Sequence, residues 1–230
     1  IRFKGEDIKK RKVCFFKNEI LNEYKTILIS RETSLLGRKE VLSGKAKFGI
    51  FGDGKELPQI AMAKAFQRGD HRSGYYRDQT FMLALNEISV QQIFSALYAN
   101  TDLKKEPMSG GRQMGSHFMS NYIDEKGDFI DSTQKYNSSA DISPTSGQMP
   151  RLLGLAMASK LYRDGSFNSK NFSNNGNEVA WGTIGNASTS EGPFFEVFNA
   201  AGVHQVPMII SVWDDDCLLY TSPSPRDFLL

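Results

Sequence analysis

The spacing of apolar residues predicts helices along the first two thirds of the chain. Apolar residues recur at helical spacing from Asn18 to Ser43, and Gly44 is placed to end that helix. Four more helices are predicted, in chain order, over Pro58–Phe66, Gln79–Asn86, Ser89–Asn100 and Gln148–Arg163. Between them, residues 69–74 are predicted to form a polar turn. Residues 101–147 form a Gly-, Ser- and Asn-rich stretch too long for an ordinary connection, which is typical of a functional or disordered loop.

A strand–helix–strand pattern follows in the last third of the chain. Glu178–Gly185 and Val206–Trp213 are short apolar runs, and Ser190–Gly202 between them has helical spacing. Such a unit of about 35 residues is a βαβ motif, in which the two strands are parallel and the crossover is right-handed. The predicted fold class is therefore α/β, with a parallel sheet flanked by helices.

Composition and charge exclude two classes of protein. Hydrophobic residues make up 40% and charged residues 23% of the 230 residues, which fits one soluble domain. The net charge of +2 is far from the dominant basic surface of a general nucleic-acid binder. Because no apolar stretch approaches the ~18 residues of a membrane span, no membrane partner is expected. Cys14 and Cys217 form neither a disulfide framework nor a metal-ligand spacing, which favours a cytoplasmic location.

The two ends of the chain differ from the region between them. Residues 1–17 are predicted to be a basic N-terminal extension. The string from Cys217 to Asp227 is Ser/Pro-rich, has no period of its own and resembles a translated sequencing adapter. We therefore interpret 18–215 as a partial domain and 216–230 as a foreign tail with few packed contacts. A natural Pro-rich tail is the alternative.

Polar residues follow both strands of the predicted βαβ unit. Gly185–Ser188 ends the first strand, and Trp213–Asp215 ends the second. Ligands of open parallel sheets bind at the carboxyl ends of the strands, and a helix N-terminus there favours phosphate. Carboxylate and amide oxygens beside phosphates suit Mg²⁺. The pattern alone leaves two interpretations open: a phosphate and Mg²⁺ site, or an ordinary polar loop.

Residues 178–215 also resemble the thiamine-diphosphate motif in the α subunits of 2-oxo acid dehydrogenases. That motif begins with Gly-Asp-Gly at a strand end and closes with an Asn pair after the next strand. Asn186 stands at the acidic position and Asp215 at the closing position. The resemblance implies that these two residues bind Mg²⁺, with the carboxylate and the carboxamide exchanged and Asp214 as the alternative ligand. It also implies that Gly185, Ala187 and Ser188 contact the cofactor.

Four further segments resemble the same family, in the same order. Gly54–Glu56 resembles its Gly-Gln-Glu helix start, and Tyr75–Asp78 its diphosphate-contacting Tyr-Arg pair. Gly111–Phe118 resembles the Gly-Arg-Gln-Met…His segment of the branched-chain enzymes, and Ser143–Pro150 the segment beneath the aminopyrimidine ring. The resemblance implies cofactor contacts from Tyr76, Arg77, Arg112, Ser143 and Thr145, and a catalytic role for His117.

The resemblance implies a specific activity. The expected reaction is oxidative decarboxylation of a 2-oxo acid of the branched-chain type, dependent on thiamine diphosphate and Mg²⁺, with acyl transfer to a lipoyl group. The α part holds the diphosphate and the metal. A β subunit or fused β half completes the site in a homodimer or heterotetramer, and a lipoyl-bearing acyltransferase is the partner. The fragment alone is expected to be inactive. Two alternatives stay open: a pyruvate or acetoin dehydrogenase α subunit, and a non-catalytic relative that lost its metal site.

Three further features of the sequence are interpreted as parts of the structure rather than of a functional site. Gly52–Gly54 repeats the opening letters of the motif, but no oxygen ligand follows at the partner spacing, so a turn is predicted. His71 is predicted to be solvated in its polar turn. Phe194, Phe195 and Phe198 are predicted to lie in the core.

Overall fold

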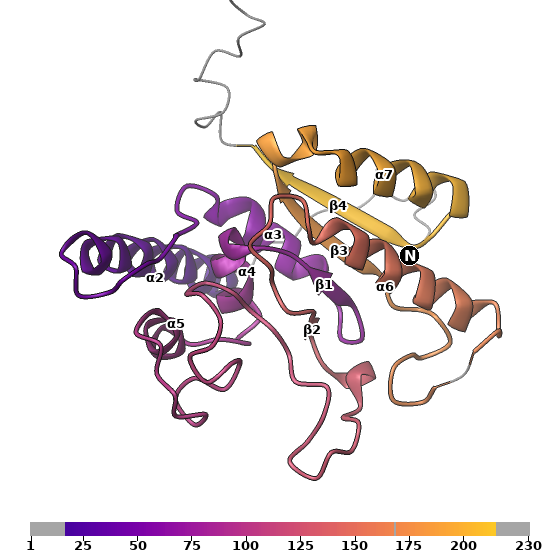
Figure 1. Ribbon diagram of the computed structural model, residues 1–230, viewed down its shortest axis with the longest axis horizontal. Coiled ribbons are helices and arrows are strands. Elements are labelled where there is room, and N and C mark those ends of the chain that lie inside the picture. The colour runs from indigo at the N-terminus through magenta and orange to yellow at the C-terminus, as the bar shows by residue number, and fades with distance from the viewer. Residues whose placement is uncertain (1–16, 168, 215–230) are drawn as a thin grey trace, which may run out of the picture.

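The computed structural model describes residues 17–167 and 169–214, which form a small parallel sheet with helices packed on its two faces (Figure 1). The helices are α2 (Lys17–Leu42), α3 (Glu56–Ala65), α4 (Gln79–Ala84), α5 (Val90–Leu97), α6 (Met149–Arg163) and α7 (Gly192–His204). The strands are β1 (His71–Ser73), β2 (Asn137–Ser138), β3 (Ala180–Gly185) and β4 (Met208–Trp213). Short 3₁₀ turns lie at η1 (Tyr76–Asp78), η2 (Ser132–Gln134) and η3 (Ala187–Ser190).

The strands run in the order β2-β1-β3-β4, and every neighbouring pair is parallel. Strands β3 and β4 are in register along their whole length, from Ala180 opposite Met208 to Gly185 opposite Trp213. Helix α7 connects them, so the predicted βαβ unit and the α/β fold class are confirmed. Parallel strands end at one edge of the sheet, and the segments that follow β1, β3 and β4 therefore meet there.

Strand β3 separates two apolar clusters because successive side chains point to opposite faces of a sheet. Ala180 and Ile184 pack with Leu152 of α6 and with α7 on one face. Trp181 packs on the other face with residues of α3 and α4, including Met62 and Phe81. A side chain at Gly182 would collide with Leu152, which explains a glycine in the middle of this strand.

The predicted polar turn at residues 69–74 is wrong, because this segment contains the central strand β1. Its three residues are polar and too few to show an alternating pattern. Arg72 is fully buried and is neutralised there by two carboxylates. His71 is half-buried rather than solvated: its ring stacks on Tyr122, and burial lowers the pKa of His71 to about 4.

Helix α2 forms as predicted, but its faces are reversed. The residues it buries are small and mostly polar: Ser30, Thr33, Ser34 and Gly37. Most of the apolar residues that predicted the helix are exposed, among them Leu21, Tyr24, Leu28 and Leu35. The core prediction for α7 also fails in part, because Phe195 and Phe198 are about three-fifths exposed, at 60% and 62%.

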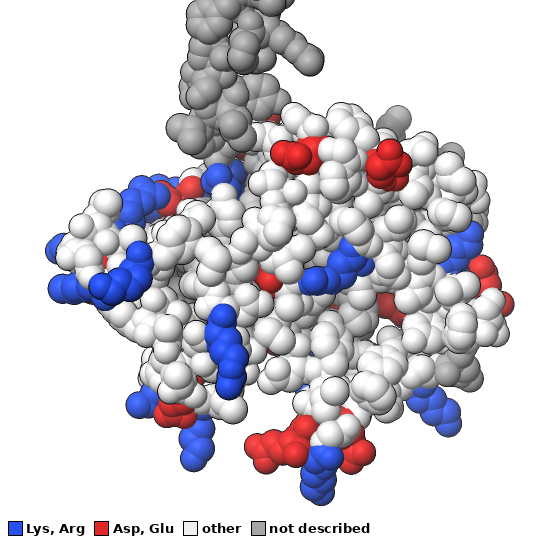
Figure 2. All heavy atoms as spheres, viewed as in Figure 1, with Lys and Arg blue, Asp and Glu red and all other residues white. Residues whose placement is uncertain are grey.

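The predicted extension and tail, residues 1–17 and 216–230, lie outside the described residues apart from Lys17, which begins α2. Basic and acidic side chains both occur on the face drawn in Figure 2, with uncharged surface between them. Among the described helices, none combines the length and apolar content that a membrane crossing requires.

Candidate functional site

A small cleft lies at the carboxyl edge of the sheet, where three segments meet. Tyr75 and Tyr76 reach it from the turn after β1, and Ser188 reaches it from η3 after β3. The third wall is the segment before α6, which contributes the residues from Ile142 to Ser146. The cavity has a volume of about 80 Å³. Four residues singled out in the sequence line it together: Tyr76, Ser143, Thr145 and Ser188.

Two more predicted residues adjoin this cleft. His117 is buried, and its Nε2 lies 3.1 Å from Oγ of Ser143. Gly185 lies under the ring of Tyr75: a Cβ atom on Gly185 would be 3.4 Å from Oη of Tyr75 and 3.8 Å from Oγ of Ser188. These are ordinary van der Waals distances, so Gly185 lies in contact range of both cleft residues.

Two predicted residues are placed less directly. The guanidinium of Arg77 lies over the ring of Tyr76, 5.3 Å from its centroid, and the Arg77 carbonyl accepts a hydrogen bond from Gln59 at 2.7 Å. Arg112 is exposed and donates to the carbonyl of Ser109 at 3.1 Å. Neither arginine lines the cavity. Arg77 is adjacent to a residue that does, whereas Arg112 belongs to the long loop on the α5 side.

The predicted metal ligands are described only in part. Asn186 is buried, and its Nδ2 has no hydrogen-bond partner among residues 17–167 and 169–214. Ala187 follows it at the start of η3 and is half-buried. Asp215 lies outside the described residues, while Asp214 is exposed. Over the described part of the chain, no three His, Cys, Asp or Glu side chains group closely enough to hold a metal ion.

A second orphaned group lies in the cleft wall. Ser146 lines the cavity and has a φ of 63°, a left-handed conformation that is uncommon for a residue with a side chain. Its Oγ is buried and has no hydrogen-bond partner within the described part of the chain. Buried polar groups are normally satisfied, and strained backbone clusters at functional sites. The Oγ of Ser146 and the Nδ2 of Asn186 are thus two buried polar atoms without a described partner near the strand ends, and Ser146 belongs to the cleft lining.

A buried charge cluster joins the segments that carry the cleft. Arg72 of β1 donates from Nε to Oδ2 of Asp78 at 2.8 Å and from Nη2 to Oδ2 of Asp141 at 3.0 Å. It also donates to Oγ of Ser138 in β2 at 2.6 Å. Burial alone would lower the pKa of Arg72, but the two carboxylates raise it above its ordinary value. Arg72 therefore stays charged and ties the Tyr76 segment to the Ser143 segment.

The loop that carries Arg112 is organised by one carboxylate. Glu106 is fully buried and accepts backbone N–H bonds from Met108, Ser109 and Gly111 at 3.0, 2.9 and 2.8 Å. The Ser109 hydroxyl donates to it as well, at 2.7 Å. Burial raises the pKa of Glu106, but these donors outweigh burial and hold the pKa below its ordinary value. The long loop therefore has fixed internal structure here.

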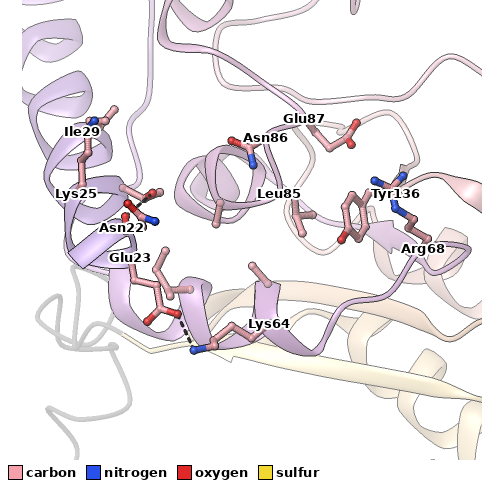
Figure 3. Close-up of a pocket in the computed structure, with 14 residues that line it drawn as sticks. Asn22, Glu23, Lys25, Ile29, Lys64, Arg68, Leu85, Asn86, Glu87 and Tyr136 are labelled. Atoms are coloured by element: carbon pink, nitrogen blue, oxygen red, sulfur yellow. Dashed lines mark hydrogen bonds and ion pairs between the residues drawn. The ribbon is translucent and has the colours of Figure 1, made fainter. Parts of the chain in front are cut away.

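A larger cavity lies elsewhere, between α2, α3 and the end of α4 (Figure 3). Its volume is about 780 Å³. Two of its basic residues already have partners: Lys64 pairs with Glu23 at 2.6 Å, and Arg68 donates to the Gln134 carbonyl at 2.7 Å. None of the residues predicted to act in chemistry lines it. The smaller cleft at the strand ends is therefore the stronger candidate.

Sequence reasoning missed the residues that hold the site together. Arg72 lay in a predicted turn, and Asp141 received no role. Asp78 appeared only as the last letter of the segment that contains Tyr76 and Arg77. No local pattern marks a buried ion pair between residues distant in sequence. The one available signal was the concentration of charged and polar residues immediately after an unrecognised strand.

Two comparisons with known proteins identify the family of this chain. Residues 24–215 match the family model described as dehydrogenase E1 component. The chain is also 31% identical over 196 residues to the 2-oxoisovalerate dehydrogenase subunit alpha of Bacillus subtilis (strain 168). That alignment covers 83% of this chain and 49% of the relative, so the chain spans about half the length of the curated relative that it matches. The family match covers most of the chain, including the whole carboxyl-edge cleft, and the chain therefore belongs to the family of dehydrogenase E1 components.

Proposed function

We propose that this chain is the diphosphate- and Mg²⁺-binding α part of a thiamine-diphosphate-dependent 2-oxo acid dehydrogenase with a branched-chain substrate. The observation that carries the proposal is the cleft where Tyr76, Ser143, Thr145 and Ser188 converge from three segments at the strand ends. The relative from Bacillus subtilis, a 2-oxoisovalerate dehydrogenase subunit, supports the branched-chain preference. Asn186 at the acidic position of the motif is the one feature that favours a non-catalytic relative.

The donor set of the cleft suits the diphosphate end of the cofactor. Hydroxyl groups line it, among them that of Ser146, and hydroxyl groups can bond to phosphate or metal-bound oxygens. Asn186 follows β3 next to the turn that carries Ser188. The volume of about 80 Å³ is well below the roughly 300 Å³ at which whole-ligand pockets begin. The cleft therefore fits part of the cofactor, and the remainder would lie against a β subunit or fused β half.

Five of the predicted residues have distinct roles in this proposal. Tyr76 and Arg77 hold the diphosphate, since a guanidinium is suited to paired bonds with phosphate oxygens. Asn186 and Asp215 offer Mg²⁺ one carboxamide and one carboxylate oxygen. His117 would act at the cleft wall, where its Nε2 lies within hydrogen-bond distance of Oγ of Ser143, at 3.1 Å. When bound, thiamine diphosphate supplies the chemistry of decarboxylation.

The proposed assembly follows from the same family resemblance. Arg112 on the exposed loop would face the open side of the site. A lipoyl-bearing acyltransferase would accept the acyl group there, and the whole enzyme would be a cytoplasmic homodimer or heterotetramer.

Calorimetric titration of the complete protein with thiamine diphosphate, with and without Mg²⁺, tests the proposal. Ser188→Ala should weaken binding about tenfold, because a hydrogen bond to a charged group is worth roughly 1.5–3 kcal/mol. Ser190→Ala is the matched control from the same turn: Ser190 is exposed and should leave affinity within about twofold. Asp215→Ala should abolish the Mg²⁺-dependent part of the affinity, and Asp214→Ala should affect it less.

Two outcomes would decide against the proposal. A complete protein that binds no thiamine diphosphate would favour the non-catalytic relative. An enzyme that binds the cofactor but prefers pyruvate to 2-oxoisovalerate would retain the cofactor assignment and refute the branched-chain substrate. We expect kcat/KM to favour the branched acid by at least about tenfold, the discrimination that methylene-sized differences allow in an apolar pocket.

A further inference from the structure

Asp78 connects three strands through one carboxylate. It ends η1, the turn that presents Tyr76, and it is fully buried. Its Oδ2 accepts from Nε of Arg72 at 2.8 Å and from the hydroxyl of Thr183 in β3. Its Oδ1 accepts from the indole Nε1 of Trp213 in β4 at 2.9 Å. Oδ2 also accepts the backbone N–H of Tyr75 at 3.4 Å. Because the carboxylate has no exposed surface, it acts through these four neighbours.

The bond to Trp213 reaches the second side of the cleft. Trp213 is the last residue of β4 and immediately precedes Asp214 and Asp215. Its carbonyl accepts the backbone N–H of Asn186 at 3.4 Å. The carboxyl ends of β3 and β4 are thus joined to each other and, through Asp78, to the turn after β1.

We propose that Asp78 is a positioning residue that sets the separation between the diphosphate-binding and metal-binding sides of the cofactor site. The inference rests on the proposed function. Metal and diphosphate must be bound together, so a shift of either side weakens both contacts. A bond to a buried carboxylate is well suited to hold that spacing, because a buried charge loses much of its stabilisation when it moves away from its donors.

The chain contains a matched control for this bond. The sequence has two tryptophans, and the second, Trp181, donates from Nε1 to Oδ2 of Asp70 at 3.0 Å. Both tryptophans and both aspartates are buried. Asp70 immediately precedes β1, however, at the amino edge of the sheet, whereas Asp78 follows β1 at the carboxyl edge. The two Trp–Asp bonds therefore share their chemistry and differ in distance from the cleft.

The test compares Trp213→Phe with Trp181→Phe in the complete protein. Each change removes one indole N–H donor and keeps an aromatic ring, and the Arg72–Asp78 ion pair remains. The measurements are the Kd of thiamine diphosphate with Mg²⁺ by calorimetry and the free energy of unfolding by urea titration. Trp213→Phe should raise the Kd about tenfold and Trp181→Phe less than twofold, although both lower stability. In turnover assays, the KM for the cofactor should rise in Trp213→Phe while kcat at saturating cofactor stays within twofold.

Asp78→Asn and Asp70→Asn provide the second comparison, since each keeps the size of the side chain. Asp78→Asn should raise the Kd more than Trp213→Phe does, because it also disturbs the bonds to Arg72 and Thr183. Equal changes in Kd for the site-edge and amino-edge variants would overturn the positioning role while leaving the cofactor assignment in place. A wild-type protein that binds no cofactor would overturn the proposed function, and this inference with it.

Discussion

Helices α2 and α6 bury opposite kinds of side chain. Helix α6 places Met149, Leu152 and Ala156 against β3 and α7, as expected for an amphipathic helix on a sheet. Helix α2 instead buries hydroxyl groups and a glycine, and its leucines are exposed. Apolar periodicity thus identified both helices correctly, but it identified the inward face of only one. The period shows that a helix has an apolar stripe, not which surface covers the stripe.

The inward face of α2 is held by polar contacts and close approach. Ser30 shares a hydrogen bond of 2.7 Å with Thr80, and Gln79 donates to Oγ of Ser34 at 3.1 Å. Small side chains let α2 lie close to α4, where these partners are located. Exposed leucines in such number are typical of a surface that another segment or chain covers. The difference between the two helices can be tested by changing equivalent residues in each.

The largest effect is expected for Leu152→Ala in α6. The side chain of Leu152 in α6 is fully buried against β3. Its truncation therefore loses apolar burial and leaves a cavity beside Gly182. The free energy of unfolding should fall by about 2–5 kcal/mol. Urea unfolding of this chain, followed by circular dichroism, measures the loss. A loss below about 1 kcal/mol would show that the α6 face is not the packed one.

Smaller changes in unfolding free energy, opposite in sign, are expected when one glycine in each helix is replaced by alanine. Gly37 of α2 is buried, and a Cβ atom there would collide with the ring of Phe51. Gly37→Ala should therefore destabilise the chain by about 1–3 kcal/mol, as overpacking does. A Cβ atom on Gly154 of α6 would meet nothing within 4 Å, so Gly154→Ala should stabilise by up to about 1 kcal/mol through helix propensity. Urea unfolding of both variants measures the two changes, and stabilisation by both would contradict close packing of α2.

The smallest effect is expected for Leu28→Gln on the outer face of α2. Leu28 is 44% exposed, and glutamine has nearly the helix propensity of leucine. The unfolding free energy of this chain should change by no more than about 0.5 kcal/mol. Differential scanning calorimetry of the variant beside wild type provides the measurement. A loss comparable to that of Leu152→Ala would mean that α2 is rotated relative to the arrangement described above.

Sequence predicted the elements whose signals are local. Helix α6 was expected at Gln148–Arg163 and lies at Met149–Arg163, and β3 and β4 were expected within two residues of their ends. Each has a run of apolar residues long enough to define a period. Strands β1 and β2 have three and two polar residues, and only pairing with distant strands makes them strands.

The residues of the site could be predicted from the sequence to a similar extent. The residues expected to contact a ligand follow strands or lie in a long loop, so Tyr76, Ser143 and Ser188 could be named before they were seen together. The buried residues that hold these side chains in place could not be predicted. The Arg72 cluster depends on neutralisation by two carboxylates that lie six and 69 positions away along the chain, and no sequence window contains all three.

The carboxylate of Glu106 takes the place in its loop that an external anion would otherwise take. Three N–H groups and a hydroxyl surround it, so the loop carries its own counter-ion. A loop that orders only around its ligand loses conformational entropy at the moment of binding, at about 1–2 kcal/mol for each residue fixed. In this loop, the conformational entropy is lost when the chain folds, before any ligand binds. The backbone that carries Arg112 is therefore ordered before a ligand binds. A partner that contacts this loop meets an ordered surface rather than a mobile chain.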